Sequence, residues 1–221
     1  MIRNIIFDLD GTITDSQKGI VNGVKHTVSE MNLELDPKLY TEFIGPPLEE
    51  SFSKFTNLEG DAVTDAVATF RSYYLEKGWL EMNLYDGIED TLRNLKQEGY
   101  DLYIATSKLY SSAKRILGRY ELLDYFTYIA GATYDSSRVI KADVIAYLLE
   151  REGLDTEESI MVGDRANDIE GALENSLKAV GVSYGYGHDE EFKNAIAVVD
   201  SPAELYSFFK NLSDKRVNKY D

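Results

Sequence analysis

Short apolar runs alternate with amphipathic segments along most of the chain. The runs have the length of buried strands, and they cover residues 5–7, 102–105, 159–162 and 179–182, with a weaker run at 128–131. Between them, apolar residues at spacings of three and four predict helices at 90–98, around 116, and at 141–152, 168–175 and 202–212. Strands that alternate with helices imply βαβ units. The pattern therefore predicts an α/β fold with a parallel sheet.

Residues 16 to about 79 interrupt this alternation, because they read as helices and contain no convincing strand. Apolar residues between positions 20 and 31 recur at spacings of four and three and form one face. Asp36 followed by Pro37 marks another helix start, and further helices are expected at 48–55 and 61–77. We therefore expect a helical domain at 16–84, inserted after the first strand of a core formed by 1–15 and 85–221.

The composition narrows the classes of partner. At 221 residues the chain is long enough for one full domain and a smaller appendage. Its net charge of −16 argues against binding nucleic acid or an anionic membrane, because both need a basic patch. The absence of cysteine excludes thiolate metal sites, and two histidines are too few for a multi-histidine zinc site. With no signal-peptide region and no long apolar run, we expect a soluble cytoplasmic protein, as a monomer or a homodimer.

Two aspartates directly follow the first predicted strand. Asp8 and Asp10 are two positions apart, so in extended chain they point to the same side, roughly 6–7 Å from each other. Two like charges at the end of an apolar strand repel and lose hydration unless a cation or a shared proton compensates. Gly11 then allows a sharp turn with any sign of φ. The alternative is an ordinary strand exit made of turn-forming residues.

Further polar residues lie where other predicted strands end, which is the edge at which open α/β sheets bind ligands. Thr106, Ser107 and Lys108 offer hydroxyls, backbone N–H groups and a cation, which together can hold an anion. The alternative is a plain helix cap. Lys141 begins a helix, where the helix dipole disfavours a cation, and broken local rules often mark functional sites. A solvated surface lysine is the alternative.

The segment after the strand at 159–162 carries two acids. Asp164 leaves this strand and Asp168 follows four positions later, so both can gather near one helix N-terminus. Carboxylate oxygens with room for water suit Mg²⁺, which takes few protein ligands and keeps several waters. The alternative is stabilisation of the helix N-terminus by acidic residues without a metal.

These four groups together resemble the motifs of the haloacid dehalogenase superfamily of phosphotransferases. They occur in that family's order: Asp8-Leu9-Asp10-Gly11-Thr12, Thr106-Ser107-Lys108, Lys141, and Gly163-Asp164 through Asp168. The resemblance spans nearly the whole chain, and the helical insert is similar to the cap class 1 group with its phosphoglycolate phosphatase-like enzymes. It implies a Rossmann-like three-layer sandwich with a helical cap domain at 16–84. One departure is Ala142 after Lys141, where relatives often carry proline.

The resemblance also implies roles for single residues. Asp8 would be the nucleophile that becomes a phosphoaspartate, and Asp10 the general acid and then the base. Thr106 and Lys141 would hold the phosphoryl oxygens. Mg²⁺ would be the cofactor, with Asp8, Asp10, Asp164 and Asp168 as its site and the carbonyl of Asp10 in support. The expected substrate contacts are Gly11, Thr12, Ser107 and Lys108 and, from the cap, Pro46, His26 and Arg71.

The function expected from this resemblance is a Mg²⁺-dependent phosphomonoesterase that hydrolyses a small phosphorylated metabolite, similar to phosphoglycolate phosphatase. Two alternatives are a 5′-nucleotidase of the same family and a sugar phosphomutase similar to β-phosphoglucomutase. The non-enzyme alternative is a phosphate-binding or phosphoacceptor module. The acid two residues after Asp8 and the long helical insert argue against that module.

Overall fold

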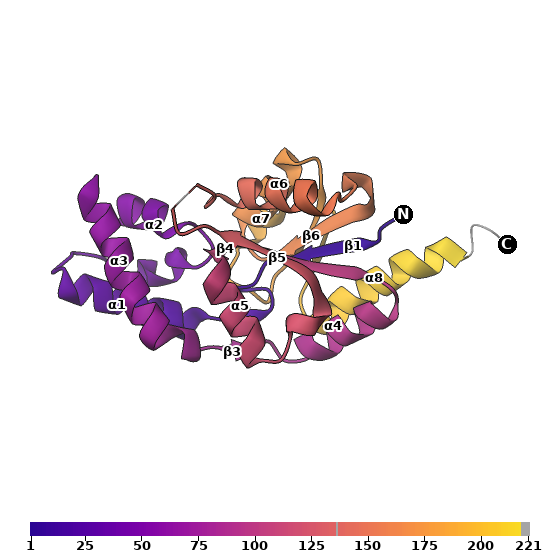
Figure 1. Ribbon diagram of the computed structural model, residues 1–221, viewed down its shortest axis with the longest axis horizontal. Coiled ribbons are helices and arrows are strands. Elements are labelled where there is room, and N and C mark those ends of the chain that lie inside the picture. Colours follow the sequence, from indigo (N-terminus) through magenta and orange to yellow (C-terminus); the bar gives the residue numbers. More distant parts are fainter. Residues whose placement is uncertain (136, 218–221) are drawn as a thin grey trace.

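A six-stranded parallel sheet forms the centre of the molecule (Figure 1). The computed structural model describes residues 1–135 and 137–217, the last five of these by their backbone alone. In spatial order the strands are β5 (Phe126–Ala132), β4 (Asp101–Leu109), β1 (Asn4–Phe7), β6 (Ser159–Gly163), β7 (Lys178–Val182) and β8 (Ala197–Val199). Because β1 lies between β4 and β6, the residues that follow these three parallel strands meet at one edge of the sheet.

Helices cover both faces of the sheet, because alternate residues of each strand point to opposite sides. Ile5 and Phe7 share a hydrophobic cluster with α4 (Ile88–Gln97), α5 (Tyr110–Arg119) and α8 (Pro202–Val217). Ile6 points the other way and packs with α6 (Lys141–Glu152) and α7 (Ala166–Glu174). Figure 1 shows α6 and α7 above the sheet and α4 and α8 below it. The predicted α/β fold, a three-layer sandwich around a parallel sheet, is confirmed.

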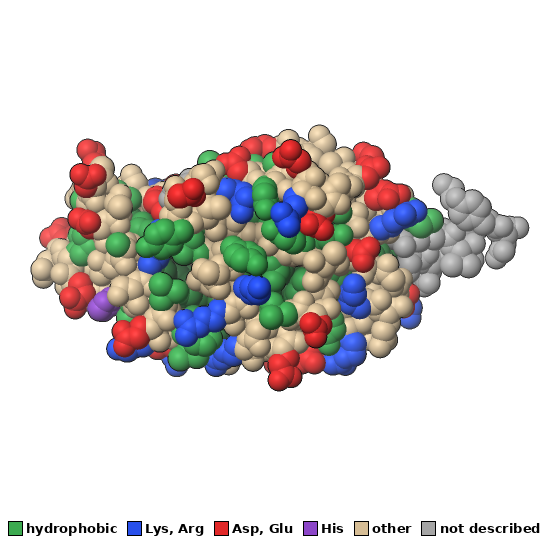
Figure 2. All heavy atoms as spheres, in the orientation of Figure 1, with side chains coloured by type: hydrophobic (Ala, Val, Ile, Leu, Met, Phe, Trp, Pro, Cys, Tyr) green, Lys and Arg blue, Asp and Glu red, His purple; other side chains and the backbone are tan. Residues whose placement is uncertain are grey.

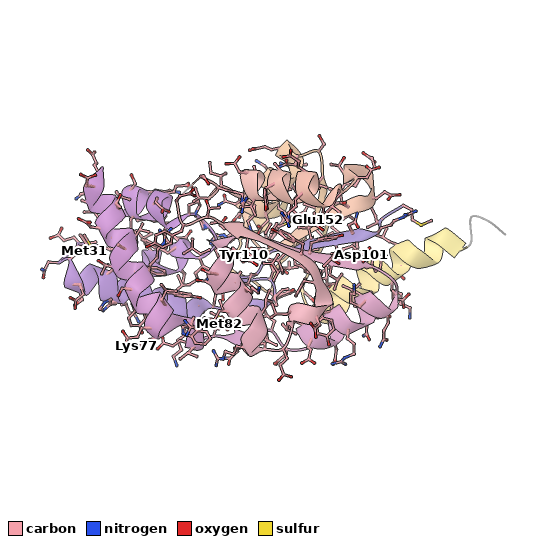
Figure 3. All side chains as sticks on the ribbon, viewed as in Figure 1. Met31, Lys77, Met82, Asp101, Tyr110 and Glu152 are labelled. Carbon is pink, nitrogen blue, oxygen red and sulfur yellow. The ribbon has the colours of Figure 1, made fainter. Side chains whose placement is uncertain are left out.

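Residues 16–84, which we call the cap segment, leave the sheet after β1 and return before α4. They form α1 (Gln17–Glu30), α2 (Leu48–Phe55) and α3 (Asp61–Glu76), with 3₁₀ helices at Pro37–Phe43 and Gly78–Leu80. The two connections pair with each other as the antiparallel strands β2 (Thr14–Asp15) and β3 (Asn83–Leu84). Figure 3 marks Met31 at the end of the cap segment remote from the sheet, and Met82 where the chain returns to it.

The structure differs from the sequence pattern at several boundaries. β4 continues to Leu109, past its predicted end at Ala105, because it stays paired with β5 through a register shift after Thr106. α7 begins at Ala166, so Asp168 lies in its first turn. Strands β2, β3 and β8 were not predicted, since two or three residues are too few for an apolar pattern. α8 runs to Val217, beyond its predicted end at 212. No helix among the described residues is long and apolar enough to cross a membrane.

Candidate active site

A tight turn after β1 carries the first two acids. Asp8 extends the strand ladder, since its N–H donates to the Val162 carbonyl at 2.9 Å. Asp8 and Asp10 are both buried. Gly11 has a φ of +87°, and a Cβ at this position would overlap the Asp164 carboxylate. Glycine is therefore needed here both for the backbone conformation and for the close approach of a third acid.

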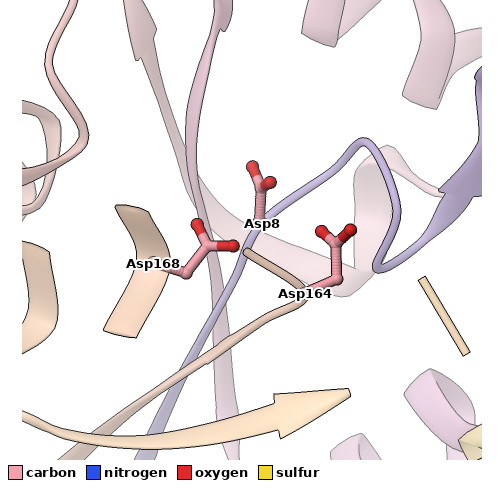
Figure 4. A group of neighbouring side chains, drawn as sticks. All are labelled: Asp8, Asp164 and Asp168. Atoms are coloured by element: carbon pink, nitrogen blue, oxygen red, sulfur yellow. The ribbon is translucent and has the colours of Figure 1, made fainter. Parts of the chain in front are cut away.

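Three buried carboxylates converge next to this turn. Asp8, Asp164 and Asp168 each offer an oxygen within 4.8 Å of the other two, and Figure 4 shows the three side chains as neighbours. We call these three residues the acid cluster. Burial raises the pKa of Asp164 well above its ordinary value and that of Asp8 to about 6, and the charge of Asp168 acts in the same direction on both. Like charges without hydration are an environment that favours a bound cation.

The acid cluster fits a hard divalent cation. Oδ1 of Asp8 and Oδ1 of Asp168 are buried, and apart from the ammonium of Lys141 they have no hydrogen-bond partner among the described residues. A set of carboxylate oxygens suits a metal such as Mg²⁺, Mn²⁺ or Ca²⁺. Among the described residues the carboxylate of Asp10 is not part of this cluster.

Lys141 provides a cation within the acid cluster. Its Nζ lies 2.7 Å from Asp8 Oδ1 and 2.8 Å from Asp168 Oδ1, and it donates a hydrogen bond to the Ala105 carbonyl at 3.1 Å. The residue is 2% exposed. Burial disfavours the ammonium form, but the two carboxylates outweigh burial and raise the pKa of Lys141. These contacts explain a lysine at a helix start, because two ion pairs exceed a dipole cost of a few tenths of a kcal/mol.

A second ion pair engages Asp10. Lys108 Nζ lies 2.8 Å from Asp10 Oδ2 and donates to the Tyr74 hydroxyl of α3 at 3.0 Å. Thr106 is buried, and its Oγ1 accepts a hydrogen bond from the Lys108 N–H at 3.2 Å. Since Tyr74 belongs to the cap segment, this set of contacts connects the cap segment to Asp10.

A pocket lies between the cap segment and the strand ends. Asp8, Asp10, Thr106, Ser107 and Lys108 line it from the sheet. The cap segment contributes residues 45–49, Arg71 and Tyr74 together with the apolar side chains of Ile20, Phe43, Phe70 and Leu75. Pro46 and Arg71 are therefore brought to the pocket, where Arg71 forms an ion pair with Glu49 at 3.2 Å. Figure 2 shows hydrophobic side chains gathered on the visible face where the cap helices meet the core.

Three predicted substrate contacts do not line the pocket. His26 is on α1 and its ring packs against Tyr73 of α3, with 5.1 Å between centroids, so it does not line the pocket. The face of α1 that carries His26 is occupied by the contact with α3. Thr12 donates a hydrogen bond to Asp164 Oδ1 at 3.4 Å, and Gly11 packs against the same carboxylate. Gly11 and Thr12 therefore support the acid cluster and do not line the pocket.

Two features of the site were missed by sequence reasoning. The first is the loop Tyr184-Gly185-Tyr186-Gly187 after β7, in which the Tyr186 N–H donates to Asp164 Oδ2 at 2.9 Å. The Tyr186 hydroxyl donates to Asp15 Oδ1 at 2.7 Å, so the loop joins the acid cluster to the cap connection. A Tyr-Gly-Tyr-Gly stretch directly after a predicted strand was the available signal. The second feature is Arg165, which lies between Asp164 and Asp168 in the sequence and is buried at 8% exposure in the structure.

The comparisons with known proteins agree with this geometry. A 5′-nucleotidase of Pseudomonas aeruginosa is 36% identical over 191 residues, 86% of each chain. A phosphoglycolate phosphatase of Aquifex aeolicus is 32% identical over 84% of this chain and 86% of that protein. The tyrosine-protein kinase PtkA of Mycobacterium tuberculosis is 38% identical over 91% of this chain and 69% of that protein.

A crystal structure of a predicted phosphatase from Clostridium acetobutylicum superposes with a TM-score of 0.92 at 39% identity. The superposition covers 96% of this chain and 99% of that chain. The family model for haloacid dehalogenase-like hydrolases matches residues 5–182, which include all four predicted motifs. The chain therefore belongs to the haloacid dehalogenase-like hydrolase family, as one of its phosphatases.

Proposed function

We propose that the chain is a Mg²⁺-dependent phosphomonoesterase that hydrolyses a small phosphorylated metabolite through a phosphoaspartate on Asp8. The observation that carries this proposal is the position of Asp8 at the pocket, with Lys141 at 2.7 Å and two further acids beside it. Lys141 engages Oδ1 of Asp8, which leaves Oδ2 as the attacking oxygen. Phosphoryl transfer needs an in-line nucleophile and positive charge beside the equatorial oxygens, and these residues supply both.

Asp10 is the proposed proton donor. In the first step Oδ2 of Asp8 forms a bond to phosphorus, the bond to the leaving oxygen breaks, and Asp10 gives its proton to that oxygen. In the second step Asp10 takes a proton from water, the water oxygen attacks phosphorus, and the bond to Asp8 breaks. Asp10 lines the pocket, and its buried Oδ1 accepts no hydrogen bond from the described residues, so this oxygen is available for the proton.

The other residues of the site are assigned to the metal and to the phosphoryl oxygens. Asp8, Asp164 and Asp168 would bind Mg²⁺ together with the carbonyl of Asp10. When bound, Mg²⁺ supplies positive charge that offsets the charge of the phosphoryl oxygens. Thr106 and Ser107 line the pocket, and the buried Ser107 hydroxyl has no hydrogen-bond partner among the described residues. We assign this hydroxyl, with Thr106, Lys108 and Lys141, to the phosphoryl oxygens.

The pocket favours a leaving group that is larger and less polar than glycolate. Phe43, Phe70 and Leu75 present apolar surface, and the Arg71–Glu49 ion pair provides a polar edge. A nucleoside 5′-monophosphate combines an aromatic face with a polar edge, so 5′-nucleotidase activity is the second candidate. In either case residues 16–84 form the cap domain and residues 1–15 and 85–221 the phosphatase core. The cytoplasmic location and the monomeric or homodimeric state stay predictions.

A phosphate-release assay tests the proposal. The panel contains phosphoglycolate, nucleoside 5′-monophosphates and sugar phosphates, each with Mg²⁺ and with EDTA. We expect release with Mg²⁺ and none with EDTA, and a higher kcat/KM for a nucleotide than for phosphoglycolate. Full activity in excess chelator would contradict the metal assignment. Isomerisation of a sugar phosphate without release would indicate a phosphomutase, and stable labelling without turnover a phosphoacceptor module.

A further inference from the structure

Arg165 lies between Asp164 and Asp168 in the sequence, yet its side chain contacts the cap segment. Its Nε donates to Glu191 Oε2 at 3.1 Å, Nη1 to the Ile44 carbonyl at 2.9 Å and Nη2 to Glu42 Oε2 at 3.4 Å. Glu191 belongs to the core, whereas Glu42 and Ile44 belong to the cap segment. We call these four residues the Arg165 bridge. It joins the start of α7, where Asp164 and Asp168 lie, to the residues that directly precede the turn Gly45-Pro46-Pro47 of the cap segment.

The bridge is packed as well as hydrogen-bonded. Gly45 has a φ of +103°, and a Cβ there would lie 2.7 Å from Arg165 Cγ. The cap backbone therefore rests directly on the aliphatic part of Arg165. Gly45 and the two prolines that follow it line the pocket. The position of this turn over the pocket is thus set by its contact with Arg165.

The core holds Arg165 firmly in this position. The Arg165 N–H donates to Asp168 Oδ2 at 3.1 Å. Glu191 Oε2, which accepts from the guanidinium, also accepts from the Ala166 N–H at 2.7 Å. Glu191 therefore fixes both the start of α7 and the arginine side chain. Hydrogen bonds between charged groups are the stronger kind, and the Arg165 and Glu191 side chains are only 10% and 17% exposed.

We propose that Arg165 is a positioning residue that fastens the cap segment over the pocket. Its two carboxylate partners belong to different parts of the molecule. Glu191 holds the guanidinium on the core, and Glu42 connects the cap segment to the same guanidinium. Separate contacts hold the cap segment near its connections, because Arg115 donates to the Leu75 carbonyl at 3.1 Å and Arg119 to the Trp79 carbonyl at 3.2 Å. At the pocket itself Lys108 still donates to the Tyr74 hydroxyl. Breaking the bridge at Glu42 should therefore shift molecules toward an open pocket while the cap segment stays attached and the acid cluster stays intact.

A distance measurement across the bridge tests this proposal. The chain contains no cysteine, so two introduced cysteines carry spin labels without background. Ser53→Cys on α2 and Glu174→Cys on α7 place the labels at exposed positions, one on the cap segment and one on the core. Double electron–electron resonance then reports the distribution of distances between the two labels. In the otherwise unchanged chain we expect one main distance.

Glu42→Lys is the decisive variant, because it faces Arg165 with a second cation. Loss of this one charge-assisted hydrogen bond corresponds to a change of about 10-fold or more in the ratio of closed to open molecules, so the fraction of molecules at a longer distance should rise. Glu42→Gln keeps a hydrogen-bond acceptor and should shift fewer molecules. Arg165→Gln is a second route to the same opening, with its melting temperature measured to establish that it folds. Arg93→Gln is the control, since the acids that Arg93 pairs with, Glu89 and Asp90, belong to its own helix in the core.

Kinetics give an independent readout that rests on the proposed phosphatase function. Glu42→Lys should raise KM for a full-size substrate about tenfold or more, while kcat for acetyl phosphate stays within threefold. A merely structural role would lower kcat/KM for the full-size substrate and kcat for acetyl phosphate together. Distances that are the same in the unchanged chain, Glu42→Lys and folded Arg165→Gln would overturn the proposal. Shifted distances in a chain that releases no phosphate from any substrate would refute the proposed function and leave the bridge supported.

Discussion

Replacing Lys141 by methionine removes the cation beside the acid cluster and nearly keeps the side-chain length. In the native chain Lys141 Nζ lies 2.7 Å from Asp8 and 2.8 Å from Asp168. Without the ammonium, the carboxylates of the acid cluster that are ionised lie buried without a compensating cation. Removing one partner of a buried ion pair costs about 3–5 kcal/mol of stability. For a chain of this length the expected fall in Tm is about 6–20 °C, at about 2–4 °C per kcal/mol.

The stability lost in Lys141→Met should depend on pH and should be larger at high pH. The pKa of Asp8 is raised to about 6 from 3.8 because burial outweighs the attraction of Lys141, and it rises further when the lysine is removed. Below about pH 6 the Asp8 carboxyl is neutral in the folded state of both chains, so its protonation on folding costs the variant and the native chain the same free energy. The difference between variant and native chain therefore grows as the pH rises through about 6, and it is smaller near pH 5 than near pH 8.

Urea unfolding in EDTA at both pH values measures this difference. Lys178→Met is the matched control, because Lys178 is exposed and lies 3.9 Å from the exposed Glu157. Such a surface pair contributes about 0–1 kcal/mol. Adding Mg²⁺ should restore part of the lost stability near pH 8, since a second cation then compensates the same acids. Equal losses at the two pH values, or no loss at either, would refute the view that Lys141 offsets repulsion among buried carboxylates.

The site carries three further predictions. Asp8→Asn should reduce phosphate release more than about 100-fold, because the nucleophile is lost. The circular dichroism spectrum should stay native, and the stability against urea should stay the same or rise, since one buried like charge is gone. Phosphate release above about 1% of the native rate would exclude Asp8 as nucleophile. Gly185→Ala places a methyl group 2.6 Å from Asp164 Oδ2, so the Mg²⁺ affinity measured by calorimetry should fall at least about tenfold. Gly118→Ala is the control, because its Cβ would contact Leu123 at an ordinary 3.4 Å, and it should leave the Mg²⁺ affinity unchanged. Pro46→Ala combined with Pro47→Ala should lower kcat/KM for a full-size substrate and leave acetyl phosphate within a few-fold; equal falls for both would show that the turn serves closure or stability and not specificity.

The sequence by itself determined where the chemistry gathers. Apolar runs located five of the six strands of the main sheet, and the polar residues after three of them had to meet because parallel strands end at a common edge. Asp8, Thr106 and Asp164 follow from this rule alone. Lys141 was singled out because a cation is unfavourable at the start of a helix. Its ion pairs with Asp8 and Asp168 explain why a lysine lies there.

Only the tertiary structure decided which groups pair. Asp8 and Asp10 are adjacent on one strand end, yet one contacts Lys141 and the other Lys108, so a spacing of two could not assign them to one metal. Nothing in the local sequence distinguishes Arg165 from an exposed surface cation. Its role in the bridge depends on contacts with Ile44 and Glu42, which are more than a hundred positions away. His26 was excluded by the orientation of α1 against α3. Local periodicity specifies which face of a helix is apolar, whereas the partners of its polar side chains depend on how the packed elements are oriented.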